Sequence, residues 1–211
     1  MARAFRRRGS GADVRYVAQL DPDEREVVAS LMEQVRGLLE APEAPDHGDD
    51  EFSGIVAGLG IGRGDPLAEH HADVEHPRGH EGAPGPRDPA LDRLLPTANR
   101  EDEQVAAEFR RLTESGLRHR KAAALDTAVA ALRSQDAVRL DEAAARAFVT
   151  ALTDVRLVLG ERLQLRTDDD LDLLEELADS LDPEDPVVHA VALYDFLTWL
   201  QETLASALLG D

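Results

Sequence analysis

The chain has 211 residues, of which 43% are hydrophobic, and 43 acidic against 23 basic residues give it a formal net charge of −20. This length and apolar content are sufficient for one buried core. A net charge of −20 repels duplex DNA and anionic membranes, so we expect no direct nucleic-acid or membrane partner. The absence of cysteine excludes disulfides, a thiol redox switch and a thiolate metal site.

The sequence indicates a cytoplasmic protein. No apolar run follows the N-terminal arginines, and no stretch reaches the ~20 apolar residues of a membrane span. Lys121 is the only lysine among the basic residues, and alanine is abundant. This bias is typical of a high-GC genome and fits an actinobacterial source.

Residues 2–8 and 14–20 flank Gly9-Ser10-Gly11, and the second segment alternates apolar with polar side chains, which predicts a short β-hairpin. Asp21 and Pro22 then form a helix start, with a capping carboxylate followed by proline at the first helical position. We expect this helix to continue to about Leu39.

Residues 41–87 lack helical periodicity and contain prolines, glycines and scattered acids, which predicts a mobile insert with one short helix near 52–59. The glycine-rich run 58–64 lacks the strand and helix of a nucleotide-binding loop. The insert also carries histidines that have no helical ligand spacing, so we expect no functional metal site there. These histidines are His47, His70, His71, His76 and His80.

Apolar periodicity predicts helices over the rest of the chain, at 88–96, 102–134, 141–165, 171–181 and 186–209, with a possible break near Gly116. We therefore predict a mainly α protein, a bundle of about five helices with an N-terminal β-hairpin and a disordered insert. The helical core 88–211 is expected to pack with residues 1–40 as one domain.

Leu20-Asp21 and Leu140-Asp141 lie 120 residues apart, and each pair precedes an amphipathic helix. The same offset matches Val35-Arg36 with Val155-Arg156. Two explanations are open: chance agreement between two similarly built helices, or a two-fold structural repeat.

The last helix has the widest apolar face in the chain. Trp199, the only tryptophan, lies off the middle of this face, where it is either a core residue or a contact for another protein. The face itself comprises Leu193, Phe196, Leu197, Leu200, Leu204, Ala207 and Leu208.

Basic residues gather in two places, and each cluster is interpreted either as a solvated or internally paired surface or as a docking site for an acidic partner. The first twenty residues are +4 and the remaining chain is −24; their arginines are Arg3, Arg6, Arg7, Arg8 and Arg15. The second cluster comprises Arg110, Arg111, Arg118, Arg120 and Lys121.

Arg156 lies beside an apolar stripe, where it either pairs with an acid across two helices or contacts a partner. The candidate partner-binding residues are therefore Trp199, Arg156, Arg118, Arg120 and Lys121.

The ordered segments show no catalytic pattern. His119 and His189 have no serine, cysteine or paired acid at a spacing that indicates a nucleophile and its base. The acidic runs 101–103 and 168–170 fit helix N-termini better than a magnesium site. We expect no enzyme activity, cofactor or metal.

Three stretches, Asp88–Pro96, Phe148–Leu165 and Tyr194–Gly210, are similar to an actinobacterial family of unknown function that is often encoded near the Clp protease adaptor. One branch of that family is named the actinomycete oxidative-stress regulator. The resemblance covers most of the chain outside the insert.

The resemblance implies a non-enzymatic regulatory protein that modulates transcription or stress responses by contact with a sigma factor or RNA polymerase. The alternative is an accessory protein of Clp-dependent proteolysis, implied by the gene neighbourhood. A redox-responsive member would need cysteines to sense oxidation, and this chain has none. The redox switch is therefore not part of the expectation.

Overall fold

The computed structural model describes residues 2–40, 88–96, 103–134 and 137–210, with backbone only at 12, 103–112 and 168. The predicted mainly helical fold with an N-terminal strand pair is confirmed. The predicted insert, its short helix and its histidines lie outside the described residues. The elements in order are β1 (Arg3–Arg8), a 3-10 turn (Gly11–Asp13), β2 (Arg15–Gln19), α1 (Pro22–Glu40), α3 (Pro89–Leu94), α4 (Glu103–Leu132), β3 (Val138–Leu140), α5 (Glu142–Arg162), α6 (Asp168–Ser180) and α7 (Pro186–Leu209).

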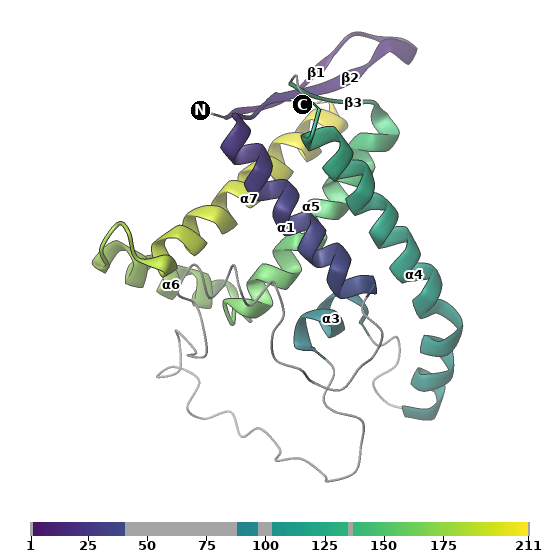
Figure 1. Cartoon of the computed structure of the whole chain (residues 1–211), viewed down its shortest axis with the longest axis vertical. Coiled ribbons are helices and arrows are strands. Elements are labelled where there is room, and N and C mark those ends of the chain that lie inside the picture. The colour runs from purple at the N-terminus through teal and green to yellow at the C-terminus, as the bar shows by residue number, and fades with distance from the viewer. Residues whose placement is uncertain (1, 41–87, 97–102, 135–136, 211) are drawn as a thin grey trace.

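Helix α5 lies at the centre of the bundle, in contact with α1, α3, α4 and α7 (Figure 1). Its side chains Phe148, Leu152 and Leu159 are among the largest that are almost fully buried. One continuous core joins these helices to the strands, and it includes residues from both sides of the insert. Of the apolar face predicted for the last helix, Leu197, Leu200, Leu204 and Ala207 are buried in this core. In α1, Val28, Leu31 and Val35 face inward, whereas Val27 is exposed.

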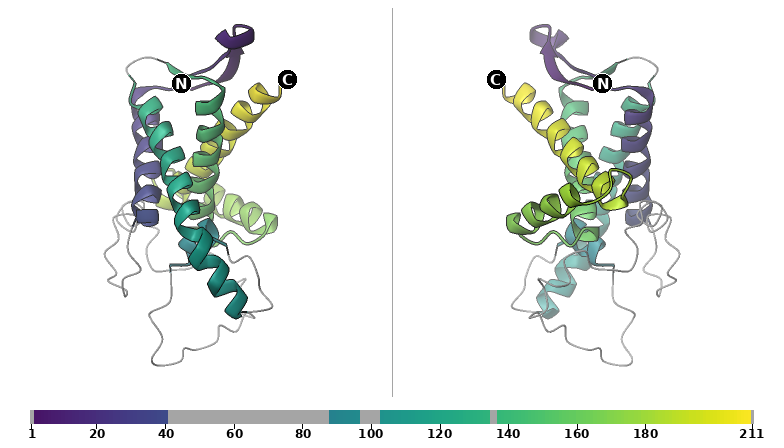
Figure 2. Two further views of the ribbon diagram at one scale, coloured as in Figure 1. Left: turned by 90° about the vertical axis from the view of Figure 1, so that its right-hand side faces the viewer. Right: turned by 90° about the vertical axis from the view of Figure 1, so that its left-hand side faces the viewer.

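The strands form a three-stranded antiparallel sheet in the order β1-β2-β3 that covers one end of the bundle (Figures 1 and 2). The inner face of the sheet packs on the helices. Phe5 meets Phe148 of α5 edge to face, with ring centroids 5.7 Å apart. The hairpin was predicted, but β3 was not, because three residues are too few to show a period and their pairing with β2 is non-local.

Hydrogen-bonded caps fix where the helices begin. The Asp21 carboxylate accepts from the backbone N–H of Glu24 at 2.9 Å, which lowers the pKa of Asp21, and Glu24 in turn accepts from the Asp21 N–H at 2.8 Å. The second oxygen of Glu24 accepts from the Ala2 N–H at 3.0 Å, so this residue also holds the first strand against α1.

The matched segments 120 residues apart occupy equivalent positions. Each strand is followed by an aspartate that caps a helix, Asp21 before α1 and Asp141 before α5, and the two strands pair antiparallel with Ala18 opposite Val138. The match in sequence therefore corresponds to two strand–helix units that share one sheet.

Two boundaries differ from the expectation. Helix α4 continues through Gly116, where an added Cβ would meet nothing nearer than an Arg120 nitrogen at 3.5 Å. Helix α6 begins at Asp168, three residues earlier than predicted, because Thr167 and Asp170 form a reciprocal capping box there. Among the described helices, none is both long and apolar enough to cross a membrane.

Candidate protein-docking surface

The strand register places five arginines on the outer face of the sheet. The inner face is defined by the buried side chains of Phe5, Tyr16, Ala18, Val138 and Leu140. Residues directly opposite each other in an antiparallel pair project to the same face. The outer face therefore contains the remaining pairs, in which Arg3 lies opposite Gln19, Arg6 opposite Val17, Val17 opposite Arg139, and Arg8 opposite Arg15.

All five arginines of this outer face are exposed. Arg8 and Arg15 stand directly across from each other, a pairing of like charges that costs stability in a sheet. We call Arg3, Arg6, Arg8, Arg15 and Arg139 the arginine face. Four of the five lie in the hairpin, whose tip extends beyond the helices (Figure 2).

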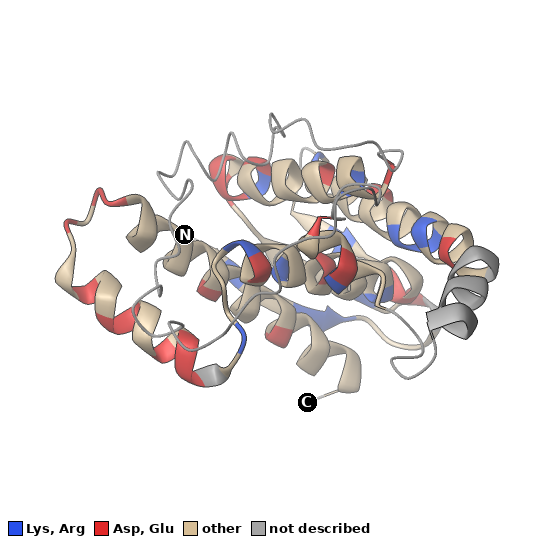
Figure 3. Cartoon of the chain, turned by 90° about the horizontal axis from the view of Figure 1, so that it is seen from below, with Lys and Arg blue, Asp and Glu red and all other residues tan. Residues whose placement is uncertain are grey.

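Basic and acidic residues gather on different elements. Arginines colour the strands of the sheet, whereas acidic residues predominate on α6, which lies to the side of the bundle away from the sheet (Figures 1 and 3). The exposed acids of α6 include Asp172, Glu175, Glu176 and Asp179. An approaching acidic molecule is consequently attracted to the sheet and repelled from α6.

Lys121, a predicted partner-binding residue, lies mostly inside the molecule. Its ammonium group donates to the carboxylate of Asp154 across the α4–α5 interface, and the side chains of Lys121 and Asp154 are only 15% and 1% exposed. Burial raises the pKa of Asp154 even though the Lys121 charge opposes the shift. The second oxygen of Asp154 is buried without a hydrogen-bond partner in the structure.

Arg118 also makes internal contacts. Its guanidinium pairs with Glu114 one turn earlier at 2.7 Å and donates to the carbonyl of Leu39 at 2.9 Å, which ties α4 to the end of α1. Arg120 and His119 are exposed on the same helix. The side chains of Arg110 and Arg111 lie outside the described residues, so the predicted basic cluster is only partly visible.

Arg156 crosses from α5 to α7, as the structural interpretation expected, but its partners are neutral. It donates to Gln201 at 3.0 Å and to the Tyr194 hydroxyl at 3.4 Å, and its guanidinium carbon lies 5.0 Å from the centre of the Tyr194 ring. Gln201 donates back to Thr153 of α5 at 3.1 Å. These contacts fix the register of the two helices.

Trp199 is half-buried and stacks on Phe196, with ring centroids 5.9 Å apart and an angle of 24° between the rings. The fully buried residues of α7 include Leu197, Leu200 and Leu204, and Trp199 packs at the margin of the core that they form. A partner role for Trp199, Arg118, Arg120, Arg156 and Lys121 stays a prediction, and the structure does not bring these five residues together on one surface.

Sequence reasoning missed a buried carboxylate, Glu161, whose side chain is 4% exposed. It pairs with Arg93 of α3 and with Arg166, both at 2.8 Å, while the neighbouring Arg162 pairs with Asp88 at 2.6 Å. These pairs attach α3 to the end of α5. The sequence did offer one signal for this site, because Glu161 is a charged residue within an otherwise apolar stripe of its helix.

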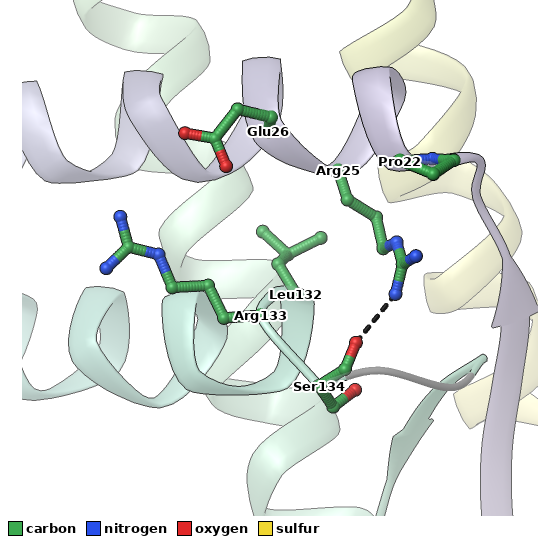
Figure 4. Close-up of a pocket in the computed structure, with 6 residues that line it drawn as sticks. All are labelled: Pro22, Arg25, Glu26, Leu132, Arg133 and Ser134. Atoms are coloured by element: carbon green, nitrogen blue, oxygen red, sulfur yellow. Dashed lines mark hydrogen bonds between the residues drawn. The ribbon is translucent and has the colours of Figure 1, made fainter.

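A hollow lies between the start of α1 and the end of α4 (Figure 4). Pro22, Arg25, Glu26, Leu132, Arg133 and Ser134 line it. Arg25 spans it and donates to the carbonyl of Ser134 at 2.6 Å. This contact satisfies a carbonyl just after the last turn of α4, so we assign Arg25 a structural role. Within the described ranges no three histidines, aspartates or glutamates gather as they would around a metal ion.

The protein is therefore a helical bundle with a small sheet at one end, and the outer side of this sheet is the arginine face. The chain belongs to a domain family of unknown function, DUF2017, whose family model matches residues 2–208. No curated protein and no solved structure gives a match.

Proposed function

We propose that this chain is a non-enzymatic regulatory protein that acts by binding another protein through the arginine face. The proposed partner is a sigma factor or RNA polymerase in the cytoplasm of an actinobacterium, in line with the resemblance to the oxidative-stress regulator branch. The supporting observation is the placement of five exposed arginines on one sheet face of a chain whose net charge is −20.

The chemistry of this face favours an acidic protein over a nucleic acid. Sheets that bind single-stranded nucleic acids combine basic residues with aromatic side chains on which bases stack. Here the residues between the arginines are Val17 and Gln19, and the sheet aromatics Phe5 and Tyr16 are buried on the inner face. A duplex would also bring its phosphates close to a body that carries a charge of −24 outside the first twenty residues.

The paired Arg8 and Arg15 support the same proposal. They place two guanidinium groups directly opposite each other on the outer face, where one acidic side chain of a partner can approach both. Arginine suits this role because its planar guanidinium binds carboxylates through two parallel hydrogen bonds. The proposed regulation does not involve thiol oxidation, since the chain has no cysteine.

Affinity capture of the intact protein from its native host, followed by mass spectrometry, tests this function. We expect RNA polymerase or sigma-factor subunits to be enriched. Enrichment of Clp components instead would contradict the transcriptional proposal and support the proteolysis alternative.

The same capture with variants tests the surface. In the triple variant Arg6→Thr, Arg8→Thr and Arg139→Thr, threonine keeps the strand propensity and removes three charges, so capture should fall at least tenfold. Arg120→Thr is the matched control, because it removes an exposed arginine from α4, and it should capture normally. Loss of capture in the Arg120 variant alone would move the interface to α4.

A further inference from the structure

A groove of about 510 Å³ runs between the open edge of the sheet and the last helix. Its lining residues from β1 are Ala4, Phe5, Arg6, Arg7 and Arg8, and those from α7 are Glu202, Thr203, Ser206 and Ala207. Strand β1 is the first strand in the order β1-β2-β3, so among the described strands only β2 pairs with it. The groove thus follows the unpaired edge of β1, where backbone groups lack a strand partner.

Building on the proposed docking of an acidic protein, we propose that the partner supplies an extended acidic segment that pairs with the open edge of β1 in this groove, as a fourth strand. Main-chain hydrogen bonds then provide affinity, and side-chain contacts on the two faces provide specificity, as in other cases of strand addition.

The arginine pattern of β1 defines the chemistry of this segment. Arg6 and Arg8 project to the outer face, whereas Arg7 lies opposite Tyr16 and projects to the inner face. Because both faces carry arginine at consecutive positions, an added strand meets positive charge on each side of its backbone. The best complement is a run of consecutive acids rather than acids that alternate with apolar residues.

The other end of the groove favours small or apolar residues. Its wall on β1 there is formed by Ala4 and Phe5. Glu202 is the single acid among the described residues that line the groove, and it repels an acidic segment. The ligand is therefore an extended segment with consecutive acids beside Arg6 to Arg8 and with small or apolar residues beyond them.

One contact has to change when this strand is added. The Phe5 N–H donates to the Thr203 hydroxyl at 3.4 Å, which is long for such a bond. Thr203 also donates to the carbonyl of Leu200 at 3.1 Å. Paired strands lie about 4.8 Å apart, so α7 has to move away from β1 at Thr203 before a carbonyl of the added strand reaches the Phe5 N–H. The Thr203 hydroxyl then keeps the Leu200 carbonyl as its partner.

The test uses a fluorescein-labelled peptide with four consecutive acids followed by Val-Thr-Val, and anisotropy measured with the intact protein at low salt. Two further peptides carry backbone N-methyl groups, one at the odd and one at the even positions. A paired strand directs only one of these two sets of N–H groups at β1. We expect one methylated peptide to lose at least tenfold in affinity and the other to bind nearly as well as the parent.

Variants of the groove complete the test. Glu202→Gln should strengthen binding of the parent peptide several-fold, and Arg7→Thr should weaken it. Equal affinities for both methylated peptides would overturn strand pairing and leave charge-driven docking on the arginine face intact. An acidic peptide that does not bind, while capture of the partner succeeds, would also overturn it. Tighter binding of a single-stranded oligonucleotide of equal charge would contradict the docking of an acidic protein itself.

Discussion

Among the ion pairs of the described residues, Lys121–Asp154 is the most deeply buried, and it joins α4 to α5. Lysine usually lies at the protein surface, but here it is part of the interior. Removing water from a carboxylate is costly, and the nearby ammonium group compensates only if it stays in place. Asp154 is held at 1% exposure with one oxygen unsatisfied, so its ionised form depends on Lys121. A lysine among arginines gave no hint of this pairing in the sequence.

Lys121→Met should destabilise the protein by about 3–5 kcal/mol at neutral pH, because it leaves a buried charge without compensation. Burial already raises the pKa of Asp154, and loss of the lysine charge raises it further. A carboxyl whose pKa is higher in the folded state binds its proton there first. The loss of stability in Lys121→Met should therefore shrink as the pH falls from the pKa of Asp154 in the folded protein toward its lower pKa in the unfolded chain.

Urea unfolding of this variant and the wild type between neutral and mildly acidic pH measures the difference. The double variant Lys121→Met/Asp154→Leu is the control and should recover most of the stability, since a buried pair replaced by apolar groups of similar size is often neutral. A deficit that is independent of pH, or no recovery in the double variant, would contradict this assignment.

Leu200 and Trp199 are neighbours in sequence but differ in environment. Leu200 is fully buried, so Leu200→Ala should create a cavity that costs about 2–5 kcal/mol. Trp199 is half-buried at the margin of the core, so Trp199→Ala should leave a smaller cavity and cost less, even though it also removes the stacking on Phe196. Thermal unfolding of both variants compares them, and equal destabilisation would show that Trp199 is a core residue.

At the scale of elements, sequence reasoning succeeded where the signal was local. Helix α7 was predicted over 186–209 from its apolar face, and the structure adds Asp185 as its cap. Glycine at position 210 ends the helix at a φ of 89°, a left-handed conformation that glycine adopts without strain. Strand β3 was missed because its three residues become a strand only through pairing with β2.

Helix α6 offers a direct test of a cap at the level of one element. Its N-cap Thr167 accepts from the Asp170 N–H at 3.3 Å, while Asp170 accepts from the Thr167 N–H at 2.7 Å. Thr167→Ala should cost about 1 kcal/mol and speed amide exchange along α6. Thr150→Ala, in the middle of α5 and exposed, is the control and should be neutral or slightly stabilising because alanine favours helix.

Urea unfolding and hydrogen exchange of these two threonine variants decide between a cap that stabilises α6 and one that does not. Identical stabilities for both variants, with unchanged exchange in α6, would mean that the Thr167–Asp170 contacts contribute nothing measurable.

Across the whole molecule, exposed arginines gather on the sheet and exposed acids on α6, and this arrangement was only partly predictable. The sequence showed a +4 segment in an acidic chain, but it could not separate a solvated cluster from a docking surface. The register resolves which arginines share a face, and β3 contributes Arg139 from a segment more than 100 residues away. Arg118, Arg156 and Lys121 looked equally available in the sequence, yet they make internal contacts.

Binding through the arginine face should weaken as salt is added, because exposed charges separated by more than the Debye length are screened. Association of the purified partner with the intact chain should slow markedly between low and physiological salt, whereas dissociation should change less. Stopped-flow measurements at several salt concentrations give both rates. An association rate that does not respond to salt would exclude electrostatic docking at this surface.

Hydrogen exchange of the intact protein, with and without purified RNA polymerase holoenzyme, tests the central claim most directly. The account predicts slower exchange in the strands, at residues 3–8, 15–19 and 138–140, and little change in α4 around Arg120 or in α7 around Trp199. Slower exchange confined to α4 or α7, or no change in the strands when polymerase is present, would contradict a regulatory role exerted through the arginine face.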